Sequence, residues 1–570
     1  MDHAKPQEQP EGALLRTSHL AALLGALSCA PTDDPSGPGD PPSDDSGHAD
    51  PVEVHVTPDP AWGDQPLRCA SSRPGAPLQW LRDGVPWDGA TTTDAPGDTI
   101  PASALAAHQT WTCVAAGGGI GVDHVTILPP DVIVVLADDL GYGDLAAYGG
   151  PTPTPRLDTL AAQGVRFTEA YAAAPVCSPS RAGLVTGRQP SRFGFEYNVL
   201  DDPTGVARGL PVGERTLADR MRALGYRTEL VGKWHLGFSA AYHPNARGFD
   251  HFFGFLNGRR PSLQPGIPGV VEYEVSPEEV ASWPASPGGW QVEQDGATVT
   301  LDERHLTDRF ADEAVARVLA PHSQPLFLML AFNAVHLPLQ ATPEQLARVE
   351  RPESAATWAY RANVAALDDA VGRVLDALDD AGVAEHTLVV FASDNGCPSV
   401  DGFCSNGGLA GGKLLMTEGG LRIPLLVRWP GHVPAGEARD GAVSLLDVLP
   451  TVIGAAGGSV AGEAIDGVDL LPWLTDAGAP PPHDVLYWRM LPVRAIREGA
   501  EKLVDSTTGT WRFDLATDPN ERRDLQLDDP PRSRALADEL DARARLYVPP
   551  LWLGQPATVD YYGTQQNIVF

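Results

Sequence analysis

Apolar runs of strand length alternate with amphipathic stretches of helix length from residue 130 to about residue 545. Each run is apolar without interruption, which is typical of strands buried on both faces of a sheet, and the longer stretches repeat their apolar residues at helical spacing. This alternation predicts an α/β fold with a large, mostly parallel sheet sandwiched by helices, in which ligands bind beyond the carboxyl ends of the strands. We expect strands at 132–137, 228–231, 326–331, 388–392 and 425–429, and helices at 216–224 and 362–381.

A different pattern precedes this region, because residues 52–129 consist of short alternating runs separated by turn signals. Such alternation predicts a small β domain. The order Cys69, Trp80 and Cys113 resembles the immunoglobulin-like sandwich, in which a core Trp packs on a disulfide between the sheets. The segment is short for that sandwich, and Trp111 stands where a Tyr is usual. A generic small β domain held by one disulfide is therefore the alternative.

The N-terminal residues show neither pattern and suggest export. Residues 20–27 are apolar and lead into Ala-Leu-Ser-Cys-Ala, which resembles a secretory segment closed by a bacterial lipoprotein box, with Cys29 as the lipidated residue. We expect residues 1–29 to be a signal or lipoprotein leader and residues 30–51 to be an acidic linker rich in Pro, Asp, Ser and Gly. A disordered cytosolic leader is the alternative. The leader and the linker therefore predict an exported protein in the cell envelope, lipid-anchored or periplasmic or extracellular. No apolar run reaches the ~18–20 residues of a membrane-spanning helix, so we do not expect the chain to span a bilayer.

The composition of the chain argues against nucleic-acid binding. The chain has 570 residues, with 41 Lys and Arg against 74 Asp and Glu, and a formal net charge of −33. This charge repels phosphate backbones, so we expect no nucleic-acid partner. A hydrophobic fraction of 43% together with 59 Gly and 54 Pro describes a globular chain with long loops, where functional sites are commonly built.

Oxygen-bearing side chains follow two of the expected strands. Asp138 and Asp139 come directly after the first strand, and Asp394 and Asn395 follow the strand at 388–392. Carboxylates with an amide carbonyl, and no His or Cys beside them, suit a hard cation such as Ca²⁺ or Mg²⁺. Either pair alone would more often be a turn whose side chains cap their own backbone. Their joint position on two strand ends favours the cation site.

The segment from Cys177 to Arg188 reads C-S-P-S-R-A-G-L-V-T-G-R. Ser178 and Pro179 are typical of a helix start and Gly187 of a helix end, which puts Cys177 at a helix N-terminus where an anion is favoured. The segment resembles the signature of the type I sulfatases, an arylsulfatase-like family of the alkaline-phosphatase superfamily, in which this Cys is converted to formylglycine. A buried structural Cys at a helix start is the alternative.

Four further motifs of that family follow in the same order along the chain. They are G-K-W-H-L-G at 232–237, N-A-V-H-L-P at 333–338, G-G-K at 411–413 and E-G-G-L-R-I-P at 418–424. The resemblance covers about residues 130–530. It implies an alkaline-phosphatase-like catalytic domain at 130–450, a small C-terminal α+β subdomain at 451–545 and a tail at 546–570.

The resemblance also implies the chemistry of the site. The implied catalytic residues are Cys177, Arg181, Lys233, His235, His336 and Lys413. The implied ligands of one Ca²⁺, with Mg²⁺ as the alternative ion, are Asp138, Asp139, Asp394, Asn395 and Cys177 as formylglycine. Hydrated formylglycine would attack sulfur, with Arg181 and Lys233 holding the diol and the sulfate. His336 and Lys413 would bind the ester and protonate the leaving alcohol, and His235 would remove the proton that lets sulfate leave.

Under this resemblance, each of the six cysteines has a role. Cys177 would be the modified nucleophile and Cys29 the lipid anchor. The expected disulfides are Cys69–Cys113 and Cys397–Cys404. Two disulfides indicate an oxidising compartment, in agreement with the leader. Cys397 also opens an insertion after the family's D-N-G, and Ala410 stands where Arg often precedes G-G-K, so these two departures bear on the substrate more than on the chemistry.

The sequence therefore predicts a sulfatase that hydrolyses sulfate monoesters. Its acidic net charge disfavours long polyanions and favours a small aryl sulfate or carbohydrate sulfate. Maturation would need a formylglycine-generating enzyme, and membrane contact would come through the anchor alone. Two alternatives remain: a phosphonate or phosphate ester hydrolase of the same superfamily, and a non-catalytic surface glycan-binding protein with an unmodified Cys177. An aldehyde at position 177 would exclude the second alternative.

Overall fold

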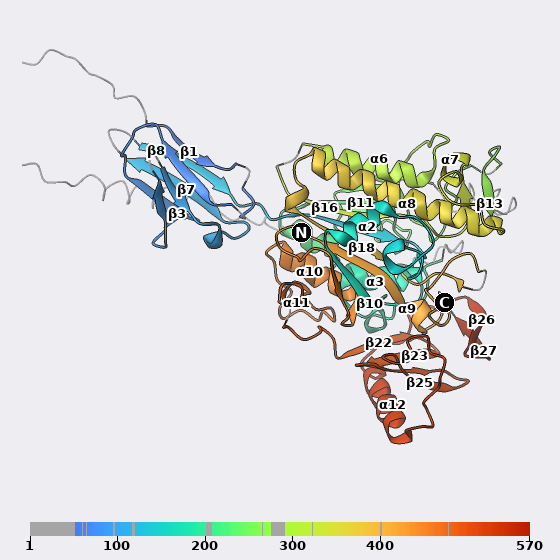
Figure 1. The fold of residues 1–570 in the computed structure, drawn as a ribbon. Helices are drawn as coiled ribbons and strands as arrows, with labels where there is room; N and C mark the ends of the chain where they lie inside the picture. Colours follow the sequence, from blue (N-terminus) through green and yellow to red (C-terminus); the bar gives the residue numbers. More distant parts are fainter. Residues whose placement is uncertain are drawn as a thin grey trace, which may run out of the picture. The chain divides into compact units, whose positions relative to one another are not determined.

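The computed structural model describes residues 52–569 except for 60, 64, 95–96, 117–119, 201–207, 265, 275–290, 322, 400–401 and 477. The chain divides into two compact units, 1–129 and 130–570, and each is described by itself (Figure 1). The expected leader, linker and anchor residue Cys29 lie outside the described residues. Of the helices that are described, none is both long and apolar enough to cross a membrane.

Two four-stranded antiparallel sheets make up the described part of the first unit. One has the order β1 (Val54–Thr57), β2 (Leu67–Ser71), β6 (Gly97–Ile100), β5 (Thr92–Asp94), and the other β4 (Val85–Pro86), β3 (Leu78–Arg82), β7 (Thr110–Ala116), β8 (Ile120–Thr126). The predicted disulfide between Cys69 on β2 and Cys113 on β7 is present and joins the two sheets. Trp80 and Trp111 meet edge to face beside it, with ring centroids 6.2 Å apart. The unit thus has an apolar core of its own.

An eleven-stranded sheet forms the centre of the second unit. All five runs predicted as strands lie in it: β9 (Asp131–Ala137), β11 (Arg227–Lys233), β16 (Leu326–Ala331), β18 (Thr387–Ser393) and β19 (Arg422–Arg428). The order runs β15 (Ala297–Thr298), β14 (Glu293–Gln294), β12 (His251–Phe255), β11, β16, β9, β18, β19, β10 (Val165–Tyr171), β20 (Glu437–Arg439), and β21 (Val443–Ser444) also pairs with β10. A separate ladder joins β13 (Val271–Tyr273) to β17 (Leu339–Ala341).

The centre of the sheet is parallel, as predicted, because β12, β11, β16, β9 and β18 pair in parallel in that order. β19 departs from the parallel pattern and runs antiparallel to both β18 and β10. The chain reaches β19 through the short helix α9 (Glu418–Leu421), directly from the loop that follows β18 at the carboxyl edge. It therefore enters the sheet from that edge, and the start of β19, not its end, lies near the expected site.

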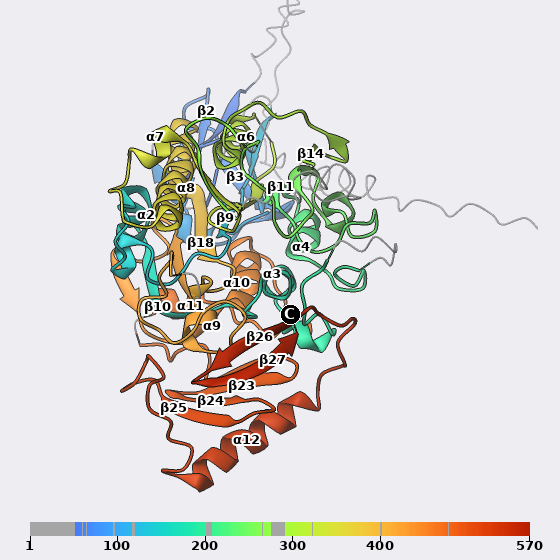
Figure 2. The same cartoon turned by 90° about the vertical axis from the view of Figure 1, so that its right-hand side faces the viewer.

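Helices cover both faces of this sheet (Figures 1 and 2). Alternate residues of β9 pack on opposite faces of the sheet: Ile133 and Val135 belong to one apolar core, and Val132 and Val134 belong to the other. The first core includes residues of α2 (Pro155–Ala162), α6 (Leu306–Leu319), α7 (Pro343–Leu346) and α8 (Ala355–Asp380), and the second residues of α3 (Cys177–Thr186), α4 (Leu217–Ala223), α10 (Val448–Ala455) and α11 (Leu471–Thr475). α8 begins earlier than predicted because the Ser354 side chain caps its first turn.

A smaller antiparallel sheet follows at the C-terminal end, where Figure 2 shows α12 (Pro530–Ala544) on one of its faces. Its strands are β22 (Val485–Met490), β23 (Val493–Glu498), β24 (Glu501–Asp505) and β25 (Thr510–Asp514). Leu536 and Leu540 of α12 pack on this sheet. The core on its other side includes Trp488 and Tyr561, the latter from a hairpin of β26 (Pro556–Tyr561) and β27 (Thr564–Val569). The segment that we expected to be a tail therefore contains this hairpin, and α10 spans the expected boundary at residue 450.

Candidate active site

The carboxyl ends of β9 and β18 bring the four predicted oxygen ligands together. These strands pair in parallel, so Asp138 and Asp394 leave the sheet side by side. The N–H of Asp139 donates to Asp394 Oδ1 at 3.2 Å, and Asn395 Nδ2 donates to Asp139 Oδ1 at 2.7 Å. Asp139 has a φ of 61°, in the left-handed region, which indicates a sharp turn directly after the strand.

Helix α3 presents its first residue to these carboxylates. It runs from Cys177 to Thr186, and Gly187, with a φ of 66°, caps its C-terminal end, as the sequence predicted. Cys177 Sγ lies 3.6 Å from Asp138 Oδ1 and 3.8 Å from Asp139 Oδ1. Burial raises the pKa of the Cys177 thiol to about 12. An unmodified Cys177 would therefore stay protonated at neutral pH and would be a poor nucleophile.

Three cationic side chains from separate elements neutralise the three carboxylates. The pairs are Lys233–Asp138 at 2.6 Å, Arg181–Asp394 at 2.9 Å and Lys413–Asp139 at 2.8 Å, nitrogen to oxygen. Although burial opposes it, Lys413 holds the pKa of Asp139 well below its usual range. Burial and the neighbouring Asp138 raise the pKa of Asp394 to about 6. At pH 7 the six charges cancel, so an added divalent cation would leave the site positive and receptive to an anion.

Lys413 also connects the Cys177 position to His336. Its Nζ lies 3.2 Å from Cys177 Sγ and 3.0 Å from His336 Nε2. An ammonium group can only donate, so His336 Nε2 accepts, and Nδ1 carries the proton that it donates to the Leu337 carbonyl. Burial and the charge of Lys413 lower the pKa of His336 to about 3. His336 is therefore a neutral imidazole held in one tautomer.

His235 follows β11 with a φ of 60°. Its Nε2 lies 3.2 Å from the Val199 carbonyl, which can only accept, so Nε2 carries the proton. Nδ1 is buried and has no hydrogen-bond partner among the described residues. Burial and the charge of Lys233 hold the pKa of His235 well below its usual value. His235 is thus a neutral imidazole whose Nδ1 lone pair is available to accept a proton.

The residues at the strand ends fit a hard divalent cation. Asn395 Oδ1 is a buried carbonyl oxygen without a hydrogen-bond partner in the described part of the chain, beside three carboxylates. Four groups that could each supply one ligand atom lie within 4.8 Å of one another: Asp138, Asp139, Cys177 and His336. Asp394 is not one of the four, and it contacts Arg181 instead. The carboxylate and carbonyl oxygens among these groups are the ligands that Ca²⁺ or Mg²⁺ prefers. No His or Cys is adjacent to the carboxylates in the sequence, but the fold places Cys177 and His336 beside them.

Asp144, which the sequence analysis did not single out, closes the turn that carries the carboxylates. Its carboxylate accepts from the Tyr360 hydroxyl at 2.6 Å and from the backbone N–H groups of Gly141 and Ser405, each at 2.9 Å. Burial raises the pKa of Asp144 to about 7. Its position at the end of D-D-L-G-Y-G-D was a usable signal, but Tyr360 lies on α8 and leaves no local pattern.

The second predicted disulfide, Cys397–Cys404, is present and supports Lys413. The backbone N–H of Lys413 donates to the Cys397 carbonyl at 3.0 Å. Asn406 fixes the same loop, because its side chain accepts from the Cys397 N–H and donates to the Cys397 carbonyl, each at 3.1 Å. The insertion that begins at Cys397 therefore holds the backbone from which Lys413 reaches the site.

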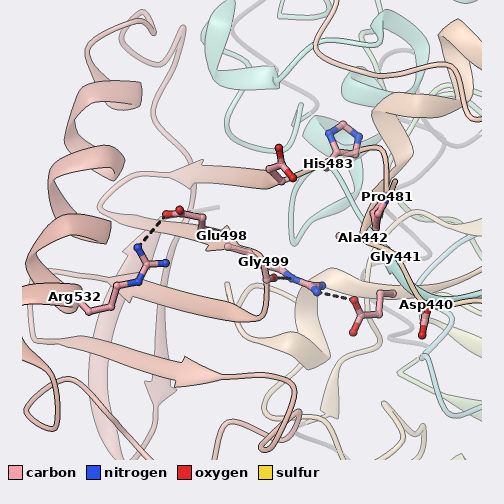
Figure 3. A pocket seen from close by; sticks show the side chains of 11 residues that line it. Asp440, Gly441, Ala442, Pro481, His483, Glu498, Gly499 and Arg532 are labelled. Carbon is pink, nitrogen blue, oxygen red and sulfur yellow. Dashed lines mark hydrogen bonds and ion pairs between the residues drawn. The ribbon is translucent and has the colours of Figure 1, made fainter. Parts of the chain in front are cut away.

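A separate cavity of about 590 Å³ lies between the main sheet region and the C-terminal sheet (Figure 3). Charged side chains of both signs line it, and several are paired with one another: Arg497 with Glu169, and Arg532 with Glu498. None of the predicted site residues belongs to its wall. This cavity is distinct from the cluster around Cys177.

A sheet edge that presents carboxylates, cations and a helix N-terminus around one small side chain defines a hydrolase site for a tetrahedral anionic ester. Comparison with known proteins identifies the family. The family model described as Sulfatase matches residues 130–459. The chain therefore belongs to the sulfatase family, in the alkaline-phosphatase superfamily, and is a sulfuric ester hydrolase.

Individual relatives agree with this family. N-acetylgalactosamine-6-sulfatase of Sus scrofa is 35% identical over 408 residues, which cover 68% of this chain and 74% of that protein. Arylsulfatase A of Homo sapiens is 35% identical over 421 residues, 69% of this chain and 78% of that protein. The crystal structure of Ps i-CgsB in complex with k-i-k-neocarrahexaose has a TM-score of 0.67 at 31% identity, and the match covers 74% of this chain and 94% of that one.

Proposed function

We propose that this sulfatase hydrolyses sulfate monoesters of small aryl or carbohydrate alcohols, with formylglycine at position 177 and one Ca²⁺ ion. The observation that carries the proposal is the position of Lys413, whose ammonium lies within 3.2 Å of Cys177 Sγ, Asp139 and His336 at once. A cation in contact with a helix-start residue, a carboxylate and a neutral His is suited to an anionic ester that is attacked at one end and protonated at the other.

The chain's own residues supply the electrostatics of this reaction. Residue 177, as hydrated formylglycine, would supply the attacking hydroxyl, and the carboxylates at the strand ends would hold a divalent cation that favours the ionisation of this hydroxyl. Arg181 and Lys233 hold Asp394 and Asp138 in position and add positive charge beside residue 177, where sulfate oxygens would lie. Because these cations are buried, their attraction for the ester is stronger than in water.

Different residues would donate and accept protons: Lys413, supported by His336, would donate, and His235 would accept. Asp139 raises the pKa of Lys413, although burial opposes this shift, so Lys413 is protonated. Its ammonium can donate a hydrogen bond to the ester oxygen and transfer one proton to that oxygen as the alcohol leaves. His336, with Nε2 accepting from Lys413, keeps that ammonium aimed at the ester. His235 would accept a proton at Nδ1 as sulfate is released.

The nucleophile is tested by mass spectrometry of the peptide that contains residue 177, from protein expressed in its native source. We expect an aldehyde there, and we expect Cys177→Ala to lower kcat for an aryl sulfate by roughly 10³-fold or more. Thr186→Ala, which changes a buried residue at the other end of α3, is the matched control and should stay active. An unmodified Cys177 in an active enzyme, or an active Cys177→Ala variant, would contradict the proposal.

The class of ester is tested by comparing aryl sulfate with aryl phosphate and phosphonate. We propose that sulfate is preferred, because every matched motif belongs to the sulfatase signature. Among sulfates, the net charge of −33 favours small substrates over long polyanions. Faster turnover of the phosphorus esters would support the alternative that the sequence left open.

We also propose roles for the outer parts of the chain. Export would be directed by residues 1–29 with lipidation at Cys29, and maturation would need a formylglycine-generating enzyme. Residues 52–129 would be an immunoglobulin-like spacer, a proposal supported by the strand orders β1-β2-β6-β5 and β4-β3-β7-β8 and by the disulfide between β2 and β7. Mass spectrometry of the membrane fraction tests the lipid, and an unmodified N-terminal peptide would contradict it.

A further inference from the structure

The loop at residues 194–199 contacts both the start of α3 and His235. Asn198 Oδ1 accepts from the N–H of Ser178 at 3.0 Å, and the Ser178 hydroxyl accepts from the N–H of Val199 at 3.1 Å. The Val199 carbonyl accepts from His235 Nε2 at 3.2 Å. The position of the loop therefore determines which nitrogen of His235 carries the proton and which is available as a base.

The chain's C-terminal segment at residues 548–552 packs on the outer side of this loop. The N–H of Leu551 donates to the Gly194 carbonyl at 2.8 Å, and Trp552 Nε1 donates to the Asn198 carbonyl at 3.2 Å. The Trp552 ring also meets Phe195 edge to face, with centroids 4.9 Å apart. Two hydrogen bonds and one ring contact thus join the segment to the loop.

Gly194 permits this close approach. Its φ is 73°, and a Cβ added there would lie 2.6 Å from the Pro549 carbonyl oxygen. The same loop is fixed near β22, where Glu196 accepts from Arg489 Nε at 2.9 Å and from the N–H of Leu491 at 3.2 Å. The loop is therefore fixed at several points along its length.

We propose that the C-terminal segment 548–552 positions the catalytic His235, and that Trp552 is the positioning residue through which it does so. Trp552 fixes the backbone of Asn198, Asn198 and Val199 bind Ser178 beside the nucleophile position, and the Val199 carbonyl holds His235 with its proton on Nε2. Without this restraint, the Val199 carbonyl shifts, and His235 is no longer held with its proton on Nε2 and its lone pair on Nδ1. The inference rests on the proposed role of His235 and extends it to a segment more than 300 residues further along the chain.

Trp552→Phe tests the proposal because it keeps an aromatic ring and removes the N–H donor. A hydrogen bond is worth about 1 kcal/mol, so kcat for an aryl sulfate should fall about 5- to 10-fold while KM stays within about twofold. Trp358→Phe is the matched control: Trp358 Nε1 also donates to a backbone carbonyl at 3.2 Å, that of Leu346, but on α8 and away from the loop. Equal kcat losses in the two variants, or a change confined to KM, would overturn the proposal.

A double-mutant cycle adds a readout that a purely structural role would not give. Asn198→Ala removes the side-chain acceptor for Ser178 but keeps the backbone carbonyl that Trp552 reaches, and both changes loosen the same loop, so the two kcat losses should be less than additive. Full additivity of the two losses would overturn the proposal.

Selective ¹⁵N-histidine NMR, assigned through His235→Gln, gives a readout independent of turnover. Nε2 of His235 should be protonated in the parent and in Trp358→Phe, and the signal should broaden or shift in Trp552→Phe. An unchanged signal in Trp552→Phe would overturn the proposal even in a preparation without sulfatase activity. Lack of sulfatase activity in Ca²⁺-loaded parent protein whose residue 177 is fully converted to formylglycine would count against the proposed function. It would not count against the positioning of His235.

Discussion

Replacing Lys502 with Met should destabilise the second unit by about 3–5 kcal/mol at pH 8, the usual effect of leaving a buried charge without its partner. Lys502 on β24 is fully buried, and its Nζ lies 2.8 Å from Glu418 Oε1 and 3.0 Å from Glu521 Oε1. Met preserves most of the side-chain length and removes the charge. Glu418 begins the E-G-G motif segment, so this ion cluster links that motif to the C-terminal sheet.

Most of the loss should come from Glu521. Glu418 keeps the Tyr171 hydroxyl at 2.8 Å and Arg422 at 3.6 Å after the substitution. Glu521 accepts from the N–H of Glu418 at 2.7 Å, which is a neutral donor and cannot replace an ammonium group. The ionised Glu521 carboxylate would therefore be buried without the positive charge that Lys502 supplies.

The loss should depend on pH in a defined direction. Burial raises the pKa of Glu521 from 4.5 to about 7 with Lys502 present, and removing Lys502 raises it further. Between pH 4.5 and this raised value, the folded variant binds more protons than its unfolded chain, so its stability increases as the pH falls. Urea unfolding should show a smaller loss at pH 5 than at pH 8.

Adding Glu521→Gln to Lys502→Met is the control, because it removes the uncompensated charge. The double variant should recover more than half of the stability lost at pH 8. Equal losses at pH 5 and pH 8, or no recovery in the double variant, would refute the assignment of the loss to a buried carboxylate.

Three further predictions concern the site and the domains. Exhaustive chelation should abolish aryl sulfate hydrolysis and added Ca²⁺ should restore it, whereas an unchanged rate in protein shown to be metal-free would contradict the cation site. Lys413→Met should lower kcat by roughly 10²–10⁴-fold. It should also raise the pKa of His336 above about 3, measured by histidine NMR, because burial is the main cause of that low pKa and the charge of Lys413 lowers it further; an unchanged pKa would contradict the contact. A chain that starts at Leu128 should fold and keep its kcat, since the second unit has apolar cores of its own; an insoluble product would contradict this independence.

The central fold could be predicted because strands buried on both faces must be apolar throughout. The runs at 132–137 and 388–392 identified β9 and β18 to within a residue or two at each end, and their parallel pairing follows from the long connections between them. The direction of β19 could not be predicted in the same way, because an equally apolar run fits either direction. The hairpin of β26 and β27 was missed because its strands are largely polar and form no continuous apolar run.

In the candidate site, the side chains could be predicted from the sequence, and the backbone contacts that position them could not. Residues that we propose to act through their own functional groups, such as Asp138, Cys177 and Lys413, must be of one chemical type at one spacing, so a motif predicts them. The groups that we propose to hold His235 in place act largely through the backbone: the Val199 carbonyl accepts a hydrogen bond from His235 Nε2, and the Asn198 carbonyl accepts one from Trp552 Nε1. A carbonyl oxygen is present at every residue, and nothing in the sequence marks the one that a distant indole will reach. Positioning by backbone contacts therefore leaves no sequence pattern, although it can decide which imidazole nitrogen is available as a base.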